Sequence, residues 1–348
     1  MKEKIIIVGG GLSGLLLAHL LSKKGIGSTI LEASSRLGGR IQTIKGGLET
    51  PMELGATWFS DMHLHLLSLI DELGLKKYPQ YSKGKSLFQT KSFEPPQEFF
   101  VSESENPSYR LVGGTQQLID RLAQNIASEK IRLNTKVISI AETEDGLLVE
   151  TSNGEQLKSE KVVLCLPPQL AGSQIHFSPS LPESIRQILP TVQTWMGGAI
   201  KFVLEYEQAF WREQQYSGML FSHAGIVTEM YDHTNFEERK FGFTGFLHSG
   251  ASSYSPEVRK ELVLEQLTKL LGEEIKNPIL YTDKIWMDEF VMSGNQIIHR
   301  PHQNNGHPAL QQIYMNGKLF FSGTETAIEF GGYMEGAVIS ALKIADRF

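Results

Sequence analysis

A glycine-rich segment near the start of the chain, Gly9-Gly10-Gly11-Leu12-Ser13-Gly14, constrains the fold more than any other feature. The residues before it, Ile5–Val8, form a continuous β-branched run, which is typical of a strand buried on both faces of a parallel sheet. The apolar run Leu15–Leu21 after it predicts a buried helix. The segment is therefore predicted to be a strand-to-helix turn with the spacing that binds a dinucleotide.

Each glycine of this spacing has a physical reason. Gly9 allows the tight turn, Gly11 lets the backbone approach a pyrophosphate, and Gly14 lets helix and strand pack closely. Similar turns also close strand–helix units that bind nothing. The second signal is Glu32, which follows the predicted strand Ser28–Leu31 where an acid accepts a ribose hydroxyl. A solvated glutamate is the alternative, but the complete order of elements favours dinucleotide binding.

Composition sets the size and class of the protein. With 348 residues and 41% hydrophobic content, the chain can build a large core and more than one domain. The net charge of −6 and the absence of a basic stripe argue against nucleic acid as a partner. The single cysteine, Cys165, excludes an internal disulfide. With no signal peptide and no membrane-spanning run, we expect a cytoplasmic protein with no membrane partner.

Three further segments contain the residue types that bind a large anionic cofactor. Arg36 and Arg40 flank two glycines in a loop just past Glu32, where arginine can donate two hydrogen bonds to phosphate. An ordinary basic surface loop is the alternative. Small residues in Glu53–Thr57 let the backbone approach a flat ligand closely. Near the C-terminus, a strand is followed by Gly323–Ala327 and then by a glycine-led helix, which could also be a simple docking helix.

Together these segments resemble the flavin-dependent amine oxidase family, which includes monoamine and polyamine oxidases. The resemblance covers most of the chain in the right order and implies that the dinucleotide is FAD. It implies an α/β fold, in which an FAD-binding Rossmann-like domain of the glutathione-reductase type carries an antiparallel-sheet substrate domain. We expect the FAD domain to comprise residues 1–79, 109–190 and 286–348, and the substrate domain to comprise residues 80–108 and 191–285.

The resemblance also implies which residues bind the cofactor. These are Gly9, Gly11, Ser13, Gly14, Glu32, Ala33, Arg36, Gly39, Arg40, Gly55, Ala56, Thr57, Val137, Trp286, Gly323, Glu325, Gly332, Tyr333, Met334 and Ala337. Val137 would meet the adenine through its backbone and Trp286 would lie near the flavin, although either could be an ordinary core residue. Segment 293–297 has no cysteine where some members attach FAD, so we expect non-covalent binding.

Lys201 and Tyr333 are the predicted catalytic residues. In Ile200–Tyr206, strand alternation alone places Lys201 on a solvated face. The resemblance instead places Lys201 where the family has a lysine that hydrogen-bonds through water to flavin N5. Tyr333 corresponds to one aromatic of a cage over the flavin, whereas Ile297 or a neighbour stands where monoamine oxidases have the other tyrosine.

The sequence departs from the family between residues 80 and 108, where larger members carry a long helical insertion. We therefore expect a smaller or more open cavity. The histidines, among them His63, His65 and His302, complete no metal-ligand spacing, so we expect no metal.

The resemblance implies an FAD-dependent oxidoreductase. Hydride would pass from the α-carbon of a neutral amine to flavin N5, giving an imine and then an aldehyde or ketone, and oxygen or another acceptor would reoxidise the flavin. The alternatives are a desaturase or protoporphyrinogen-oxidase-like enzyme acting on C–C or C–N bonds, or a flavin-binding protein without turnover. The substrate, the acceptor and the oligomeric state stay open.

Overall fold

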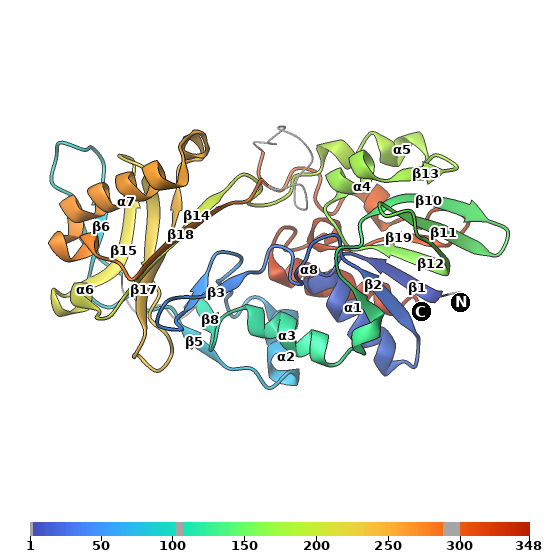
Figure 1. Ribbon diagram of the computed structural model, residues 1–348, viewed down its shortest axis with the longest axis horizontal. Coiled ribbons are helices and arrows are strands. Elements are labelled where there is room, and N and C mark those ends of the chain that lie inside the picture. The colour runs from blue at the N-terminus through green and yellow to red at the C-terminus, as the bar shows by residue number, and fades with distance from the viewer. Residues whose placement is uncertain (1–2, 102–106, 288–299) are drawn as a thin grey trace.

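The computed structural model of the chain describes residues 3–101, 107–287 and 300–348. The elements form two lobes, each built around its own sheet, and both chain termini lie at the outer end of one of them (Figure 1). In the described part of the chain, no helix has the length and apolarity needed to cross a membrane.

The first lobe contains an eight-stranded sheet of order β13-β10-β11-β12-β1-β2-β9, with β19 paired to β12. Its strands β1, β2, β9, β12 and β19 run parallel, and β10–β12 form an antiparallel meander. The strands are β1 (Glu3–Val8), β2 (Ser28–Leu31), β9 (Ile131–Arg132), β10 (Val137–Thr143), β11 (Gly146–Thr151), β12 (Gln156–Leu164), β13 (His176–Ser178) and β19 (Leu319–Phe321). This arrangement confirms the α/β fold class.

Helices cover both faces of this sheet, because its parallel strands are apolar on both sides. One face packs against α1 (Leu12–Lys23), α2 (Leu64–Glu72), α3 (Gln116–Gln124) and α8 (Met334–Ala345). The other face packs against α4 (Pro168–Gln174) and α5 (Glu183–Arg186). Alternate residues of β1 supply the two cores, with Ile5 and Ile7 facing α1 and Ile6 and Val8 facing the opposite layer.

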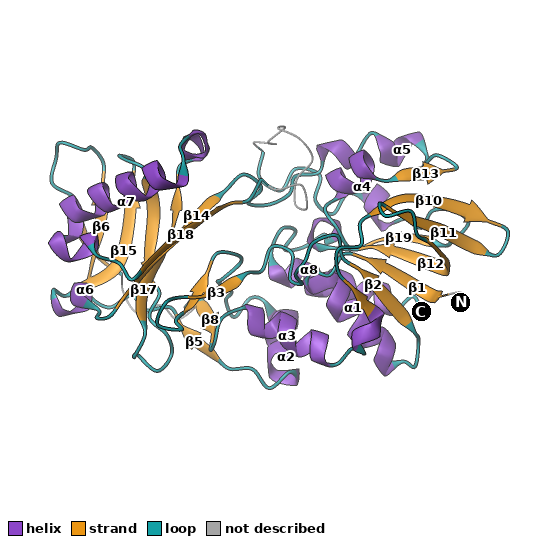
Figure 2. Ribbon diagram, in the orientation of Figure 1, coloured by secondary structure: helices purple, strands orange, loops and turns teal. Residues whose placement is uncertain are grey.

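The second lobe contains a mostly antiparallel seven-stranded sheet of order β18-β14-β17-β16-β15-β6-β7 (Figure 2). Its strands are β6 (Lys85–Gln89), β7 (Gln97–Phe100), β14 (Ile200–Tyr206), β15 (Tyr216–Ser222), β16 (Val227–Asp232), β17 (Phe241–Leu247) and β18 (Leu280–Ile285). Helix α7 (Pro256–Leu271) covers one face, and α6 (Phe210–Glu213) lies beside β15. Ser255 caps α7 by accepting a hydrogen bond from the backbone of Val258.

A small hairpin, β3 (Thr43–Lys45) and β4 (Pro51–Glu53), packs on the opposite face of β14. Val203 contacts Met52 and Leu54, and the carboxylate of Glu205 accepts hydrogen bonds from the backbone of Leu48 and Thr50. All seven residues of β14 are buried. The solvated face that strand alternation assigned to Lys201 is therefore wrong, because a distant hairpin covers it.

The short strands β5 (Lys77–Pro79) and β8 (Tyr109–Leu111) pair at the junction of the lobes. The remaining short elements are 3-10 helices at 128–130, 189–191, 249–253, 273–276, 308–311 and 324–326. Strands of the first sheet fall within residues 1–79, 109–190 and 286–348, and strands of the second fall within 80–108 and 191–285. The division into FAD and substrate domains at these boundaries stays a prediction.

Candidate functional site

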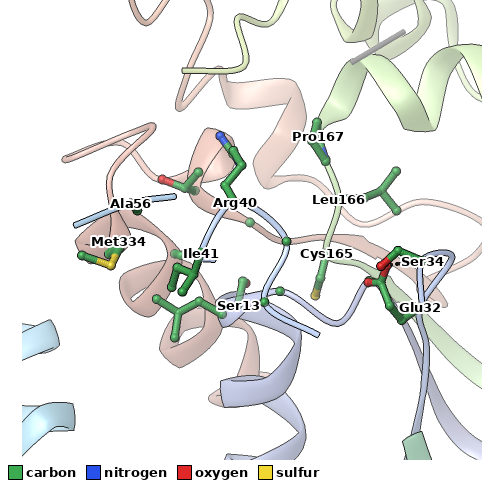
Figure 3. A pocket seen from close by; sticks show the side chains of 18 of the residues that line it. Ser13, Glu32, Ser34, Arg40, Ile41, Ala56, Cys165, Leu166, Pro167 and Met334 are labelled. Carbon is green, nitrogen blue, oxygen red and sulfur yellow. Dashed lines mark hydrogen bonds between the residues drawn. The ribbon is translucent and has the colours of Figure 1, made fainter. Parts of the chain in front are cut away.

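A cavity of about 470 Å³ lies between the ends of β1, β2 and β12 and the N-termini of α1 and α8 (Figure 3). Predicted cofactor-binding residues from both ends of the chain line it: Gly9, Gly11, Ser13, Glu32, Ala33, Arg36, Gly39, Arg40, Ala56, Gly323, Glu325, Gly332, Tyr333, Met334 and Ala337. Val137 lines a smaller adjoining cavity of about 70 Å³, which shares Gly9, Glu32 and Ala33 with the first. The folded chain thus brings this set of residues together.

The glycine turn has the geometry that its spacing predicts. Gly9 has a φ of +112°, and a Cβ there would lie 2.4 Å from the carbonyl oxygen of Cys165. A Cβ on Gly14 would lie 2.0 Å from the carbonyl oxygen of Gly9, so only glycine allows this packing of helix and strand. At Gly11 the nearest atom to an added Cβ is the Gly38 oxygen at 3.9 Å. Gly11 therefore faces open cavity rather than protein.

Glu32 anchors the end of the cavity next to β2. Its Oε2 accepts a 2.6 Å hydrogen bond from the backbone N–H of Gly10, and its Oε1 accepts 2.8 Å hydrogen bonds from the N–H and hydroxyl of Ser34 (Figure 3). Each carboxylate oxygen has further lone pairs for a ligand. The acid is thus held rigidly between the glycine turn and the following loop.

Arg36 and Arg40 contact different partners. The Arg36 guanidinium donates to the backbone carbonyls of Leu37, Gly39 and Ile41 at 2.5–3.2 Å, so it shapes the loop itself. Arg40 Nη1 instead lies 2.7 Å from Oε1 of Glu325, in an ion pair between two residues that line the cavity. Arg40 is therefore better placed than Arg36 to meet a ligand in the cavity.

Glu325 provides a test of whether FAD fits. Its side chain is 1% exposed, and beyond the ion pair with Arg40 neither carboxylate oxygen has a hydrogen-bond partner within the described residues. A buried carboxylate needs donors, and the hydroxyls of a ribityl chain supply them. Gly323 beside it also leaves space, because an added Cβ would find its nearest neighbours at 3.9 Å. These residues fit an FAD molecule that runs from Glu32 toward Glu325.

A second cavity of about 250 Å³ adjoins the first and shares Arg40, Ala56, Gly332, Tyr333 and Met334 with it. Five aromatic rings line it, from Trp58, Trp195, Phe246, Trp286 and Tyr333. The remaining lining residues include Leu54, Gly55, Thr57, Met196, Ala199 and Lys201. An apolar chamber with one lysine therefore opens from the cofactor cavity.

Lys201 is 2% exposed and is held by the segment that the sequence analysis singled out. Its Nζ donates to the carbonyl oxygen of Gly55 at 2.8 Å and to Oγ1 of Thr57 at 2.5 Å. The same nitrogen lies 4.8 Å from the ring centre of Trp58 and 5.6 Å from that of Phe246. The ammonium or amine is thus fixed in the wall of the aromatic chamber.

Burial and neighbouring charges decide the protonation of Lys201. Burial lowers its pKa to about 7, Glu53 opposes this shift, and Arg110 adds to it. Burial in turn raises the pKa of Glu53, whose carboxylate accepts hydrogen bonds from Thr115 N and Thr43 Oγ1. His233 accepts from the backbone N–H of Glu53 through Nε2, and burial lowers its pKa well below the ordinary value. The charge of Lys201 therefore interacts with a buried carboxylate, a buried histidine and the permanent guanidinium of Arg110.

Lys284 is a cavity residue that the sequence analysis missed. It lies directly opposite Lys201 on the neighbouring strand β18 and lines the larger cavity. Its Nζ lies 4.0 Å from the ring centre of Trp286 and donates to Gln42. The indole N–H of Trp286 donates to the carbonyl oxygen of Leu54, which fixes the ring in the chamber wall. The signal for Lys284 was its even spacing from Trp286, but no motif contained it.

Tyr333 stands at the mouth of the chamber and is 40% exposed. Its ring lies near-parallel to that of His302 at 5.6 Å, and His302 stacks on Trp195 at 4.2 Å. Trp195 has no counterpart in the sequence predictions, because nothing in its local pattern distinguishes it from a core aromatic. Ile297, the predicted replacement for the second cage tyrosine, lies outside the described residues.

The other histidines named in the sequence analysis contact side chains of the protein. His65 Nδ1 lies 2.8 Å from the buried carboxylate of Glu335, which also accepts from the backbone N–H groups that begin α2. His63 packs edge-on against Phe330. Within residues 3–101, 107–287 and 300–348, no group of three or more His, Cys, Asp or Glu side chains could hold a metal ion.

The fold and the two joined cavities define a flavin-dependent oxidoreductase, and comparison with known proteins agrees. The family model described as "Flavin containing amine oxidoreductase" matches residues 12–93 and 87–348, so the chain belongs to this family. The chain is 26% identical to "Probable flavin-containing monoamine oxidase A" of Dictyostelium discoideum. The alignment is 453 residues long with its gaps and covers 98% of this chain and 96% of that protein. The chain is 25% identical to "Amine oxidase [flavin-containing] A" of Sus scrofa, covering 96% of this chain and 82% of that protein.

Solved structures share the fold. Putrescine oxidase bound to putrescine superposes with a TM-score of 0.86 at 22% identity, over 100% of this chain and 99% of that one. Cyclohexylamine oxidase from Brevibacterium oxydans IH-35A gives the same TM-score, identity and coverage. The predicted family, fold and FAD cofactor are confirmed, and the desaturase alternative is not favoured.

The cofactor cradle can be tested without any substrate. In Gly11→Ala the added methyl group has room in the protein but enters the cavity, so we expect a normal fold and at least about tenfold weaker FAD binding. Gly27→Ala is the matched control, because a Cβ there meets nothing within 4 Å and Gly27 lies outside the cavity. FAD titration of the apoprotein by fluorescence and thermal unfolding measure the two effects. Equal FAD affinity in the two variants would contradict the assignment.

The lowered pKa of Lys201 predicts how stability depends on pH. Between about pH 7 and pH 10.5 the unfolded chain holds the Lys201 proton and the folded chain releases it. This lysine therefore makes stability rise with pH across that interval, by at most about 1.4 kcal/mol per pH unit. We expect Lys201→Met to lose this rise, and the loss of the lysine charge raises the pKa of Glu53 further, which acts in the same direction. Urea unfolding at both ends of the interval measures the free energy of unfolding of the wild type and of Lys201→Met. The same change in this free energy with pH in both proteins would refute the prediction.

Proposed function

We propose that this chain oxidises an amine, with non-covalently bound FAD as the acceptor of the substrate's electrons. The observation that carries the proposal is the position of Lys201, a buried lysine of lowered pKa in an aromatic chamber joined to the dinucleotide cavity. When bound, FAD supplies the two-electron acceptor that takes hydride from the carbon next to the amine nitrogen. The protein then has to bind the substrate amine, orient it and remove a proton from it.

The chamber walls favour a substrate amine over bulk water. The rings of Trp58, Trp195, Phe246 and Tyr333 present apolar surface and π-faces, which attract an ammonium group and bury its alkyl part. Because hydride leaves only a neutral amine, a proton must first be lost. The wall therefore needs a base that is unprotonated near neutral pH.

Lys201 meets that requirement. In its neutral form both N–H groups of Nζ are used by Gly55 and Thr57, so its lone pair is left to accept a proton, directly or through a water. In its charged form the third N–H becomes a donor beside the site where negative charge develops. Helix α8, whose N-cap is Tyr333, places backbone N–H groups and a positive dipole end at the same cavity. We assign Lys201 and Tyr333 as the catalytic residues on these grounds.

We propose two further properties, the final electron acceptor and the location. We propose O₂ as the final acceptor, in keeping with the oxidases that the chain resembles. We also propose a cytoplasmic location, which the sole cysteine supports: Cys165 is a buried free thiol whose pKa burial raises to about 12. Such a thiol is inert and fits a reducing compartment.

Anaerobic mixing with a panel of amines tests the function directly. The reconstituted protein should lose its yellow colour with at least one amine, and air should restore it. Lys201→Met should slow reduction or reoxidation by about 10²-fold, the size of effect found when one preorganised catalytic donor is removed. Lys269→Met on the exposed side of α7 is the control, because it removes one lysine far from the chamber.

The outcomes separate the hypotheses. If no amine bleaches the flavin, the protein is a flavin-binding protein without turnover. If amines bleach it and Lys201→Met matches the control in both half-reactions, the flavin chemistry stands and the role of Lys201 is wrong.

A further inference from the structure

Trp58 forms part of the chamber wall beside Lys201. Its ring centre lies 4.8 Å from Lys201 Nζ, compared with 5.6 Å for the ring centre of Phe246. The ring meets Tyr231 edge-on at 5.0 Å and Phe246 at a tilt at 6.3 Å. Trp58 is partly buried and lies between β4 and α2, in neither a helix nor a strand. Because ring contacts alone allow several orientations, the partner of the indole N–H decides how this ring is turned.

Gln80 is that partner. Its Oε1 accepts a 2.8 Å hydrogen bond from the indole N–H of Trp58. Its Nε2 donates to the carbonyl oxygens of Tyr81 at 3.2 Å and Asp232 at 2.7 Å. A flipped amide would place its oxygen against two carbonyls and its donors against the indole N–H, so the neighbours allow one orientation. The amide of Gln80 therefore bridges the ring to the protein backbone.

The far end of this bridge is rigid. Asp232 is the last residue of β16, and its carboxylate accepts hydrogen bonds from Arg212 Nε at 2.8 Å and Nη2 at 3.0 Å. The same carboxylate accepts from the indole N–H of Trp211, a residue with 0% exposure. The backbone N–H of Gln80 donates to the carbonyl oxygen of Ser108 at 2.8 Å. Gln80 is thus tied to the core of the second lobe.

This anchoring matters because the chamber is small. Without Gln80 the indole N–H of Trp58 loses its acceptor, and a ring carried by a loop can turn toward water instead. The chamber has a volume of about 250 Å³, so the movement of an indole changes its width substantially. An apolar pocket discriminates about 10- to 200-fold for a single methylene group. The orientation of Trp58 therefore decides how bulky a substrate the chamber admits.

We propose that Gln80 is a positioning residue that limits the size of the amine admitted to the chamber by holding the indole of Trp58 in place. The inference rests on the proposed function and concerns the specificity of the same site. Gln80 is not among the residues that line the chamber, so its effect passes through the ring.

Kinetics with two matched amines test the proposal. Benzylamine and para-tert-butylbenzylamine differ in bulk at the end of the molecule away from the amine. Gln80→Met keeps the length of the side chain and removes its amide. We expect the ratio of kcat/KM for the bulky amine to that for the small one to rise about tenfold or more, mainly through a lower KM for the bulky amine.

Two further variants complete this comparison. Gln156→Met is the matched control, because Gln156 is an exposed residue at the start of β12 in the other lobe, and its ratio should equal that of the wild type. Gln80→Asn, whose amide is one methylene group short of the indole, should raise the ratio as Gln80→Met does. It serves in place of Gln80→Met if thermal unfolding shows that the latter does not fold.

A double-mutant cycle separates positioning of the ring from a general loss of packing. Trp58→Phe keeps an aromatic ring and removes the N–H, so no hydrogen bond to Gln80 is possible. In this background Gln80→Met should change the ratio by no more than about twofold. An equal effect of Gln80→Met with and without the indole N–H would overturn the proposal.

A binding measurement separates the role of Gln80 from the oxidation itself. Benzyltrimethylammonium and its para-tert-butyl analogue are inert probes, and calorimetry with the FAD-loaded protein gives their affinities. The wild type and Gln156→Met should bind the smaller ion more tightly, and Gln80→Met should lose most of this preference even if no amine reduces the flavin. A wild type that does not discriminate between the two ions, or a preference unchanged in Gln80→Met, would overturn the proposal.

Discussion

The hydrogen bonds from Lys201 to Gly55 and Thr57 join the two lobes in the wall of the aromatic chamber. Lys201 lies on strand β14 of the second sheet. Gly55 and Thr57 lie between strand β4 and helix α2, which packs against the first sheet. A buried lysine without such acceptors would cost several kcal/mol, so the two lobes hold each other in register through this contact. The aromatic chamber forms around it.

The charges behind this contact are balanced unusually. The buried carboxylate of Glu53 interacts with the charge of Lys201, and Lys201 and His233 both interact with the permanent charge of Arg110. His233 must stay neutral because its Nε2 accepts a hydrogen bond from the backbone of Glu53. With Arg110 always charged, the groups that can exchange a proton here are Lys201 and Glu53. The packing of the hairpin against β14 thus sets the protonation of the chamber wall.

Much of the cofactor cavity could be predicted from sequence because its signals are local. The turn at Gly9–Gly14 and the acid at Glu32 are separated by one helix and one strand, and their geometry follows from backbone rules alone. The face of Lys201 could not be predicted in this way. Its burial depends on Gly55 and Thr57, which lie about 145 positions away in the sequence.

Trp195 and Lys284 show the same limit. Each lies in a segment whose local pattern fits an ordinary strand or loop, and each acquires its place only when strands from distant parts of the chain align. The resemblance to a family located Tyr333 and Lys201, but it offered neither Trp195 nor Lys284. The place of Lys284 opposite Lys201 follows from the sheet register, which no single-sequence pattern supplies.

A crystal structure of the reconstituted FAD complex tests the central claim most directly. The account predicts one FAD molecule whose ribose lies at Glu32, whose ribityl chain meets Glu325, and whose ring lies in the chamber between Lys201 and Tyr333. A flavin ring outside that chamber, or a chain that refuses added FAD while remaining folded, would contradict the account.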